Sequence, residues 1–203
     1  MVKLLIRPFE WGGTRLSEIG DHLTRVFPDI DDYEVARESP LPLSCFFPDS
    51  FQDAPERNHR LIAGTFFLDY LRSLSSHWLY NALDLGITNL PVITPEDGQI
   101  DGLAYLCGTV ALVSANRAYF DEVDSETYIR SVVGTAVHEI GHIYGLEHHY
   151  SGSLRTKDNF LCSMDISYLK DRKNRGTKPP YLSSRSGDYF CQNCTKAIKM
   201  GKK

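Results

Sequence analysis

Residues 138–148 have the sequence His138-Glu139-Ile140-Gly141-His142-Ile143-Tyr144-Gly145-Leu146-Glu147-His148. Side chains four residues apart lie on one face of a helix, so His138 and His142 can bind the same metal ion. His148 can join them only if the chain turns, and Gly145 permits the left-handed conformation that ends a helix. Three neutral imidazoles suit zinc and leave a fourth position for water, as in catalytic sites. Glu139 is then placed to take a proton from that water. The alternative interpretation is a surface helix with solvated histidines, but such a helix would give Gly145 no role.

The histidines end a predicted active-site helix that spans about residues 125–145. Asp124 or Ser125 can cap its start, and Glu126 lies in the first turn, where the helix dipole favours negative charge. Apolar side chains recur at helical spacing and predict that one face packs against a sheet. They are Ile129, Val132, Val133, Ala136, Val137, Ile140 and Ile143.

The remaining apolar segments predict a mixed sheet with helices. Short segments with strand character are residues 2–6, 33–37, 90–93, 100–106 and 109–115. Segments with helical spacing are residues 14–27, 53–74 and 76–85. A strand–helix–strand opening is typical of parallel pairing, whereas the short Cys107-Gly108 link predicts a hairpin between residues 100–106 and 109–115. We therefore expect an α/β (α+β) domain with a mixed, twisted sheet.

Composition narrows the functional class. The chain has 203 residues, 42% hydrophobic residues and a net charge of −4, with a pI near 6.0. These values are ordinary for a soluble globular domain, and no global positive charge favours nucleic acid or anionic membranes. No apolar stretch approaches the ~18 residues of a membrane span, and no signal peptide is indicated. We expect a cytoplasmic monomer without nucleic-acid or membrane partners.

The segment after His148 is polar and has too few apolar residues to hold a shape alone. Cys191-Gln-Asn-Cys194 has the spacing of half a zinc site, and Cys162 with His149 would complete a Cys₃His tetrahedron. A closed site of this kind supplies folding free energy. We therefore expect residues 1–148 to form an N-terminal catalytic subdomain and residues 149–203 a small zinc-stapled C-terminal subdomain, together one catalytic domain. Cys45 and Cys107 have no metal-like spacing, and we expect both to be core residues.

The extended histidine motif, followed by Cys162-Ser163-Met164 and then Cys191-x-x-Cys194, resembles the archaemetzincins, a family of zinc metallopeptidases in the metzincin clan. The resemblance implies a compact metzincin-like domain with His138, His142 and His148 on the catalytic zinc and Glu139 as general base. It further implies that Met164 is the methionine of the turn beneath the metal. Cys162, Cys191 and Cys194 would bind a second, structural zinc, giving two zinc ions per chain.

Two departures from the family pattern lie close to these ligands. His149 stands where the family has its first cysteine, and the gaps at residues 150–161 and 165–190 are both longer than in the family pattern.

These departures leave alternative functions open. An insertion over the cleft would block long substrates, so one alternative is a latent or weakly active zinc-bearing protein that binds peptides or has a regulatory role. A nucleic-acid-binding module in residues 162–203 is a further alternative, disfavoured because interleaved aromatic residues are lacking. The expected activity is hydrolysis of peptide or protein substrates.

Overall fold

The computed structural model describes residues 2–11, 15–46, 61–75, 81–116, 125–149, 162–164 and 190–200. Its larger sheet has five strands in the order β2-β1-β4-β8-β7. Their bounds are β1 Val2–Phe9, β2 Ile30–Val35, β4 Ala82–Thr88, β7 Gly102–Ala104 and β8 Val110–Ser114. Strand β1 pairs in parallel with β2 and β4, and β8 is parallel to β4. Only β7 is antiparallel to its neighbour in this sheet, and it forms the edge. The mixed α/β fold expected from the sequence is confirmed.

The chain opens with a parallel strand–helix–strand unit, as the apolar pattern predicts. Helix α1 (Leu16–Val26) connects β1 to β2 and buries Leu16, Ile19 and Leu23. These residues recur at helical spacing, so one face of α1 packs on the sheet. The hairpin-like link is confirmed as well, because β7 and β8 pair antiparallel from Gly102↔Val113 to Ala104↔Ala111.

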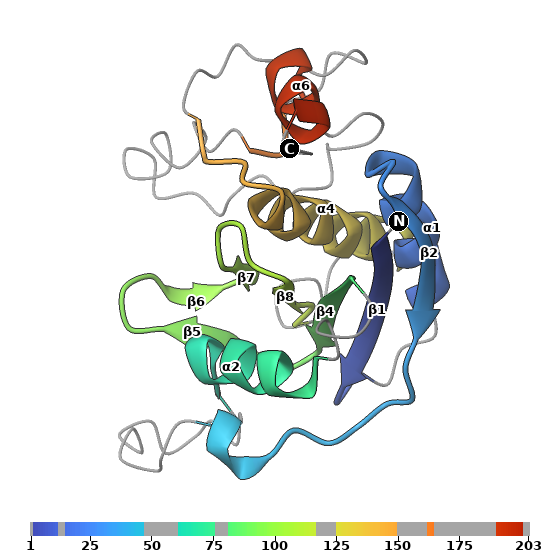
Figure 1. Cartoon of the computed structure of the whole chain (residues 1–203). Coiled ribbons are helices and arrows are strands. Elements are labelled where there is room, and N and C mark those ends of the chain that lie inside the picture. Colours follow the sequence, from blue (N-terminus) through green and yellow to red (C-terminus); the bar gives the residue numbers. More distant parts are fainter. Residues whose placement is uncertain are drawn as a thin grey trace.

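Helices cover both faces of the large sheet (Figure 1). Helix α4 (Ser125–Ile143) and α1 cover one face, and α2 (Gly64–Leu74) covers the other. Strand β4 contributes to both cores, because alternate side chains point to opposite faces. Leu83, Leu85 and Ile87 lie in the core beneath α1 and α4. On the opposite face, a Cβ at Gly86 would lie 2.6 Å from Leu71 of α2, so this position needs glycine.

A smaller sheet lies beside α2 and extends toward β7. Its strands are β3 (Ile62–Ala63), β5 (Val92–Thr94) and β6 (Gly98–Ile100), in the order β3-β5-β6. A short 3-10 helix, η1 (Leu43–Cys45), precedes it, and α6 (Gln192–Met200) lies beyond α4 on the side away from the sheet (Figure 1). No helix in the described part of the chain is long and apolar enough to span a membrane.

Three expectations from the sequence are wrong. The helix expected over residues 76–85 is contradicted for its last part, because residues 82–85 belong to strand β4. Leu83, Leu85 and Ile87 alternate with residues on the other face, and this period of two outweighs the helical spacing. Cys107 is exposed rather than buried, since it forms part of the β7–β8 turn with a φ of +57°. The helix expected over residues 53–74 begins only at Gly64, because Ile62 and Ala63 form strand β3 and pair with β5. Residues 53–60 lie outside the described residues.

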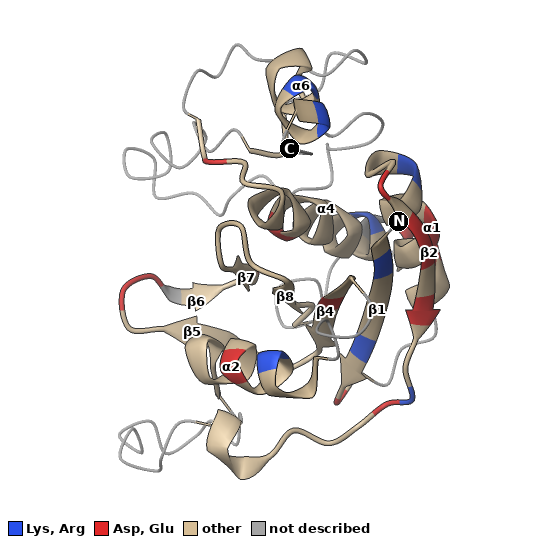
Figure 2. Cartoon of the chain, in the orientation of Figure 1, with Lys and Arg blue, Asp and Glu red and all other residues tan. Residues whose placement is uncertain are grey.

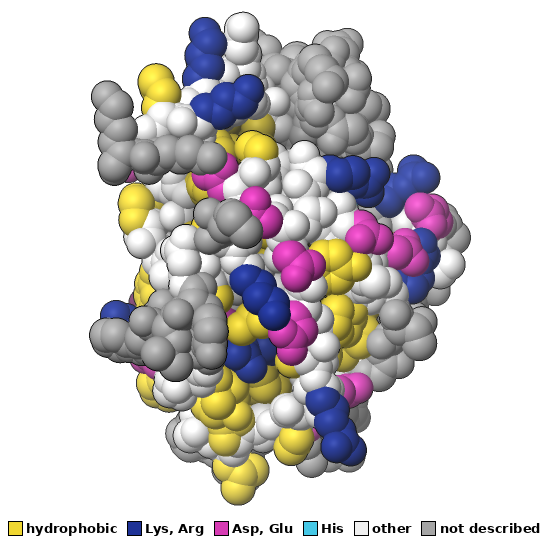
Figure 3. All heavy atoms as spheres, turned by 45° about the vertical axis from the view of Figure 1, so that its right-hand side comes forward, with side chains coloured by type: hydrophobic (Ala, Val, Ile, Leu, Met, Phe, Trp, Pro, Cys, Tyr) yellow, Lys and Arg dark blue, Asp and Glu magenta, His cyan; other side chains and the backbone are white. Residues whose placement is uncertain are grey.

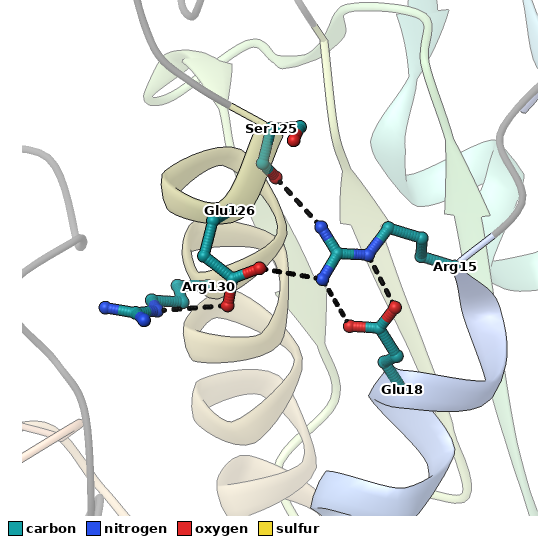
Figure 4. Close-up of polar contacts among 5 residues, drawn as sticks. All are labelled: Arg15, Glu18, Ser125, Glu126 and Arg130. Carbon is teal, nitrogen blue, oxygen red and sulfur yellow. Dashed lines mark hydrogen bonds and ion pairs between the residues drawn. The ribbon is translucent and has the colours of Figure 1, made fainter.

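A cluster of charged side chains fixes the start of α4 against α1 (Figure 4). The Arg15 guanidinium donates to the Glu126 carboxylate at 2.8 Å and to Glu18 at 2.6 Å. A further bond of 3.3 Å reaches the carbonyl oxygen of Ser125, the first residue of α4. Acidic and basic side chains alternate over the face of the molecule that carries α1 and β2 (Figure 3). The helix that bears the histidine motif is thereby tied at its beginning to a helix of the N-terminal unit.

Candidate metal centre

The end of helix α4 turns the chain back toward its own histidines. Gly145 has a φ of +80°, a conformation that residues with a Cβ rarely adopt. Its N–H donates to the carbonyl of His142 at 2.9 Å, and the N–H of Leu146 donates to that of Gly141 at 3.0 Å. These two bonds form a Schellman motif. The turn expected at Gly145 is therefore present, and it returns His148 to the helix face that carries the other histidines.

The three motif histidines converge on one point. The Nε2 atom of His148 lies 2.9 Å from that of His138 and 3.1 Å from that of His142. Zinc bound to imidazoles at about 2.0–2.1 Å in a tetrahedron separates the nitrogens by about 3.3 Å, so the cluster is close to the size zinc requires. The three residues form one of two His/Cys groups in the described residues that could hold a metal ion.

The other ring nitrogens have acceptors of their own. Nδ1 of His138 lies 2.6 Å from the carbonyl oxygen of Ser163, and Nδ1 of His142 lies 2.8 Å from that of Leu146. A proton on Nδ1 leaves the Nε2 lone pair free, so each carbonyl selects the tautomer that binds a metal. Three lone pairs facing each other at such distances repel unless a cation lies among them, and the donor set therefore fits zinc. Sequence reasoning missed both acceptors, because a backbone carbonyl leaves no signature in residue types.

Glu139 lies beside the histidine cluster and is buried, with 6% of its surface exposed. The edge strand passes directly over it, since a Cβ at Gly102 would lie 2.6 Å from Oε1 of Glu139. Burial raises the pKa of the Glu139 carboxyl to about 8, and the negative charge of Asp101 adds to this effect. A carboxyl group with a raised pKa is suited to accept and return a proton, and a cation at the histidines would favour its ionised form.

Met164 lies in the core against the part of helix α4 that carries His138 and His142. The Met164 side chain is fully buried, and its sulfur would lie 2.9 Å from a Cβ placed on Gly141, which lies between His138 and His142 in the helix. The same added Cβ would lie 3.3 Å from the ring of Phe190. A larger residue at Gly141 would displace Met164, so the close approach of the Cys162–Met164 turn to α4 depends on this glycine.

A second cluster consists of His149, Cys162, Cys191 and Cys194, whose ligand atoms lie within 4.8 Å of one another. The Sγ atoms of Cys162 and Cys194 are 3.7 Å apart. This distance is far too long for a disulfide bond of about 2.05 Å. It agrees with the separation of about 3.8 Å that two thiolates adopt on one zinc ion at about 2.3 Å. The donor set therefore fits a closed, structural zinc site.

Hydrogen bonds hold this second cluster to the turn beneath the histidines. The N–H of His149 donates to the carbonyl of Met164 at 2.9 Å, and the N–H of Cys191 donates to Sγ of Cys162 at 3.2 Å. The Cys194 thiol and this backbone N–H lower the pKa of Cys162, because both stabilise its thiolate. A thiolate is the form that binds zinc.

An open pocket adjoins the histidine cluster on the side of the edge strand. It is lined by Ala104, Leu106, His142, Glu147 and His148. Leu106 is 50% exposed, and the N–H of Cys107 donates to the carbonyl of His142 at 3.0 Å, so the β7–β8 turn docks onto the end of α4. Sequence reasoning did not find Leu106 or Gly102, because neither has a spacing relation to the histidine motif.

Comparisons with known proteins agree with these features. The model of peptidase family M54 matches residues 57–200. Archaemetzincin of Archaeoglobus fulgidus is 41% identical over 90 residues, which are 43% of this chain and 55% of that protein. Archaemetzincin of Methanopyrus kandleri is 28% identical over 150 residues, which are 71% of this chain and 72% of that protein.

The fold agrees as well. The crystal structure of the M. kandleri archaemetzincin superimposes with a TM-score of 0.69 at 22% sequence identity, covering 98% of this chain and 94% of that chain. At this identity the likeness concerns the fold, whereas the family model covers more than half of the chain. The resemblance to the archaemetzincins is thereby confirmed, and the chain belongs to peptidase family M54.

Proposed function

We propose that this protein is a zinc-dependent metallopeptidase that hydrolyses peptide bonds with Glu139 as general base. One observation carries the proposal. The Nε2 atom of His148 lies 2.9 Å from that of His138 and 3.1 Å from that of His142, close to the separation of two ligands on one zinc ion, and a buried glutamate lies beside them. Membership of a peptidase family supports the reaction class, and it implies a peptide or protein substrate.

Each residue of the site has a role that follows from its contacts. His138, His142 and His148 hold the metal through Nε2, and two of them are oriented through Nδ1 by backbone carbonyls. A zinc ion held there would polarise the scissile carbonyl and lower the pKa of a bound water. Glu139 takes a proton from that water and delivers it to the leaving amine. Its burial beneath Gly102 shields this transfer from solvent.

The edge strand offers a binding mode for the substrate. Strand β7 pairs only with β8 and forms the edge of the large sheet within the described residues. Its Gly102 lies against Glu139 and its Ala104 lines the pocket. An extended peptide added along residues 100–106 would place its backbone beside the metal, and main-chain pairing of this kind requires no particular substrate sequence.

The second cluster has a structural role in this proposal. His149, Cys162, Cys191 and Cys194 hold a second zinc, which gives two ions per chain and staples residues 149–203 onto the subdomain of residues 1–148. The tight packing of the four ligand atoms supports this assignment. Met164 supports the histidines from below, as its contact with Gly141 suggests.

The location and assembly state belong to the same proposal. All five cysteines are free, which agrees with a reducing compartment, and we propose a cytoplasmic monomer. Size-exclusion chromatography coupled to light scattering would test the assembly state. A mass of two chains at micromolar concentration would contradict the monomer.

Cleavage of a mixed-sequence peptide pool tests the function. Zinc-loaded protein should cut the pool, and Glu139→Ala should leave it intact while retaining its zinc. Loss of zinc from the variant would count against the role given to Glu139. If neither protein cuts and zinc is present in both, the protein is instead latent or binds peptides without hydrolysing them, and recovery of an intact bound peptide would identify that function.

A further inference from the structure

The pocket beside the histidine cluster combines one apolar and one acidic wall. Leu106 supplies half-exposed aliphatic surface. Glu147 supplies an exposed carboxylate from the turn between Gly145 and His148, two residues of the motif itself. Within the described part of the chain this carboxylate forms no ion pair. It is therefore available to a group that enters the pocket.

In the described segments that contribute residues to the pocket, the charged side chains all have the same sign. In residues 99–116 and 138–149, which form its walls, the charged side chains are Asp101, Glu139 and Glu147, and there is no lysine or arginine. Figure 2 shows the basic residues of the described ribbon outside these two segments, among them residues on α1, α2, β1 and α6. A zinc dication at the histidines is offset by Glu139 and by Asp101, whose charge acts on Glu139. Among the described residues, no ion pair then compensates the charge of Glu147.

We propose that this pocket accepts a lysine or arginine side chain of the substrate and so directs cleavage to bonds next to basic residues. This inference rests on the proposed peptidase function and names its substrate class. The long side chains of lysine and arginine have an aliphatic stem and a charged end, which match Leu106 and Glu147 in that order. An acidic side chain would meet Glu147 as a like charge, and a purely apolar one would leave the carboxylate without a partner.

Matched peptides that differ at one position test the inference. The variable position carries lysine, norleucine or glutamate. Separate peptide sets place it at each of the two residues on either side of the cleaved bond. At the position that occupies the pocket, kcat/KM should be about 5-fold higher for lysine than for norleucine, which is the scale of one partly exposed ion pair. In Glu147→Gln this ratio should fall to about 1, and Glu147→Lys should prefer the glutamate peptide.

Two further measurements separate this inference from the proposed function. Glu96→Gln, which removes an exposed glutamate on the turn between β5 and β6 outside the pocket, should keep the lysine preference. Zinc-loaded Glu139→Gln should bind the lysine peptide about 5-fold more tightly than the norleucine peptide, a readout that needs no turnover. Cleavage of all peptides at equal rates would overturn the pocket assignment and leave the peptidase intact. Equal binding to Glu139→Gln would overturn it even if no peptide is cut.

Discussion

The Nδ1 atom of His138 lies 2.6 Å from the carbonyl oxygen of Ser163, and this contact joins the two candidate metal sites. Ser163 stands between Cys162, a ligand candidate of the second cluster, and Met164 beneath the first. The clusters are joined again through the chain, because His148 and His149 are neighbours and belong to different clusters. A metal ion bound by the cysteines would therefore help to position the Ser163 carbonyl, which lies next to His138.

This connection predicts that the two metal sites are coupled. Cys191→Ser should reduce bound zinc from two ions to one, and the remaining site should bind zinc about 10-fold more weakly, the lower end of the effect of losing a partner that orients a ligand. Zinc titration against a chromophoric chelator measures both quantities. Cys45→Ala, which changes a buried cysteine of the other core, should leave both unchanged. An unaltered affinity of the remaining site in Cys191→Ser would refute the coupling.

The close approach of the edge strand to Glu139, the proposed general base, gives a second prediction. A Cβ at Gly102 would lie 2.6 Å from Oε1 and 2.7 Å from Cγ of Glu139, so Gly102→Ala must displace this side chain. Because misplacement of a reacting group by about 1 Å costs up to about 10²-fold, kcat should fall about 10- to 100-fold. Zinc content should stay the same, since none of the metal ligands is touched. Gln99→Ala on β6 serves as the control, and undiminished activity of Gly102→Ala would show that Glu139 is not the base.

The left-handed conformation of Gly145 at the end of α4 predicts that alanine at this position destabilises the fold. Removal of the nearby Cys107 side chain should restore only part of that loss. Gly145→Ala forces a residue with a Cβ to a φ of +80°, which should lower the free energy of unfolding by about 1–2 kcal/mol. The added Cβ would also lie 3.2 Å from Sγ of Cys107. Cys107→Ala in the same chain should remove this contact but not the backbone strain. Chemical denaturation of both variants measures the two contributions, and full recovery in the double variant would mean that φ at this position is unimportant.

The sequence indicated the candidate ligands of both sites but not the groups that orient them. Residue type and spacing were sufficient for the histidines, Glu139 and the cysteine pair, because metal ligation depends on side-chain chemistry at fixed offsets. The acceptor on Ser163 and the contact at Gly102 arise where distant segments meet, and no local pattern specifies them. Residues 82–85 were predicted as helical because a short apolar segment fits more than one period, and only the alternation of Leu83, Leu85 and Ile87 along β4 distinguishes the strand.

His22 of helix α1, which belongs to neither candidate metal site, should reduce stability in mild acid. Burial on α1, with a smaller effect of Arg25, lowers the pKa of His22 from 6.5 to about 4. The unfolded chain therefore binds a proton between pH 6.5 and pH 4 that the folded protein excludes, so the neutral side chain's contribution is complete above pH 6.5 and is lost as the pH falls through this window. Since His22 is only partly buried, we expect the free energy of unfolding to fall by about 1–2 kcal/mol across this pH window, less than the full pKa shift would give.

Comparison with His22→Gln tests this effect. The variant cannot take up the proton, so the difference in unfolding free energy between the two proteins should change by that amount from pH 7 to pH 4.5. Protonation of the zinc ligands affects both proteins equally and cancels in this difference. A difference that does not vary with pH would mean that His22 is as accessible in the folded protein as in the unfolded chain.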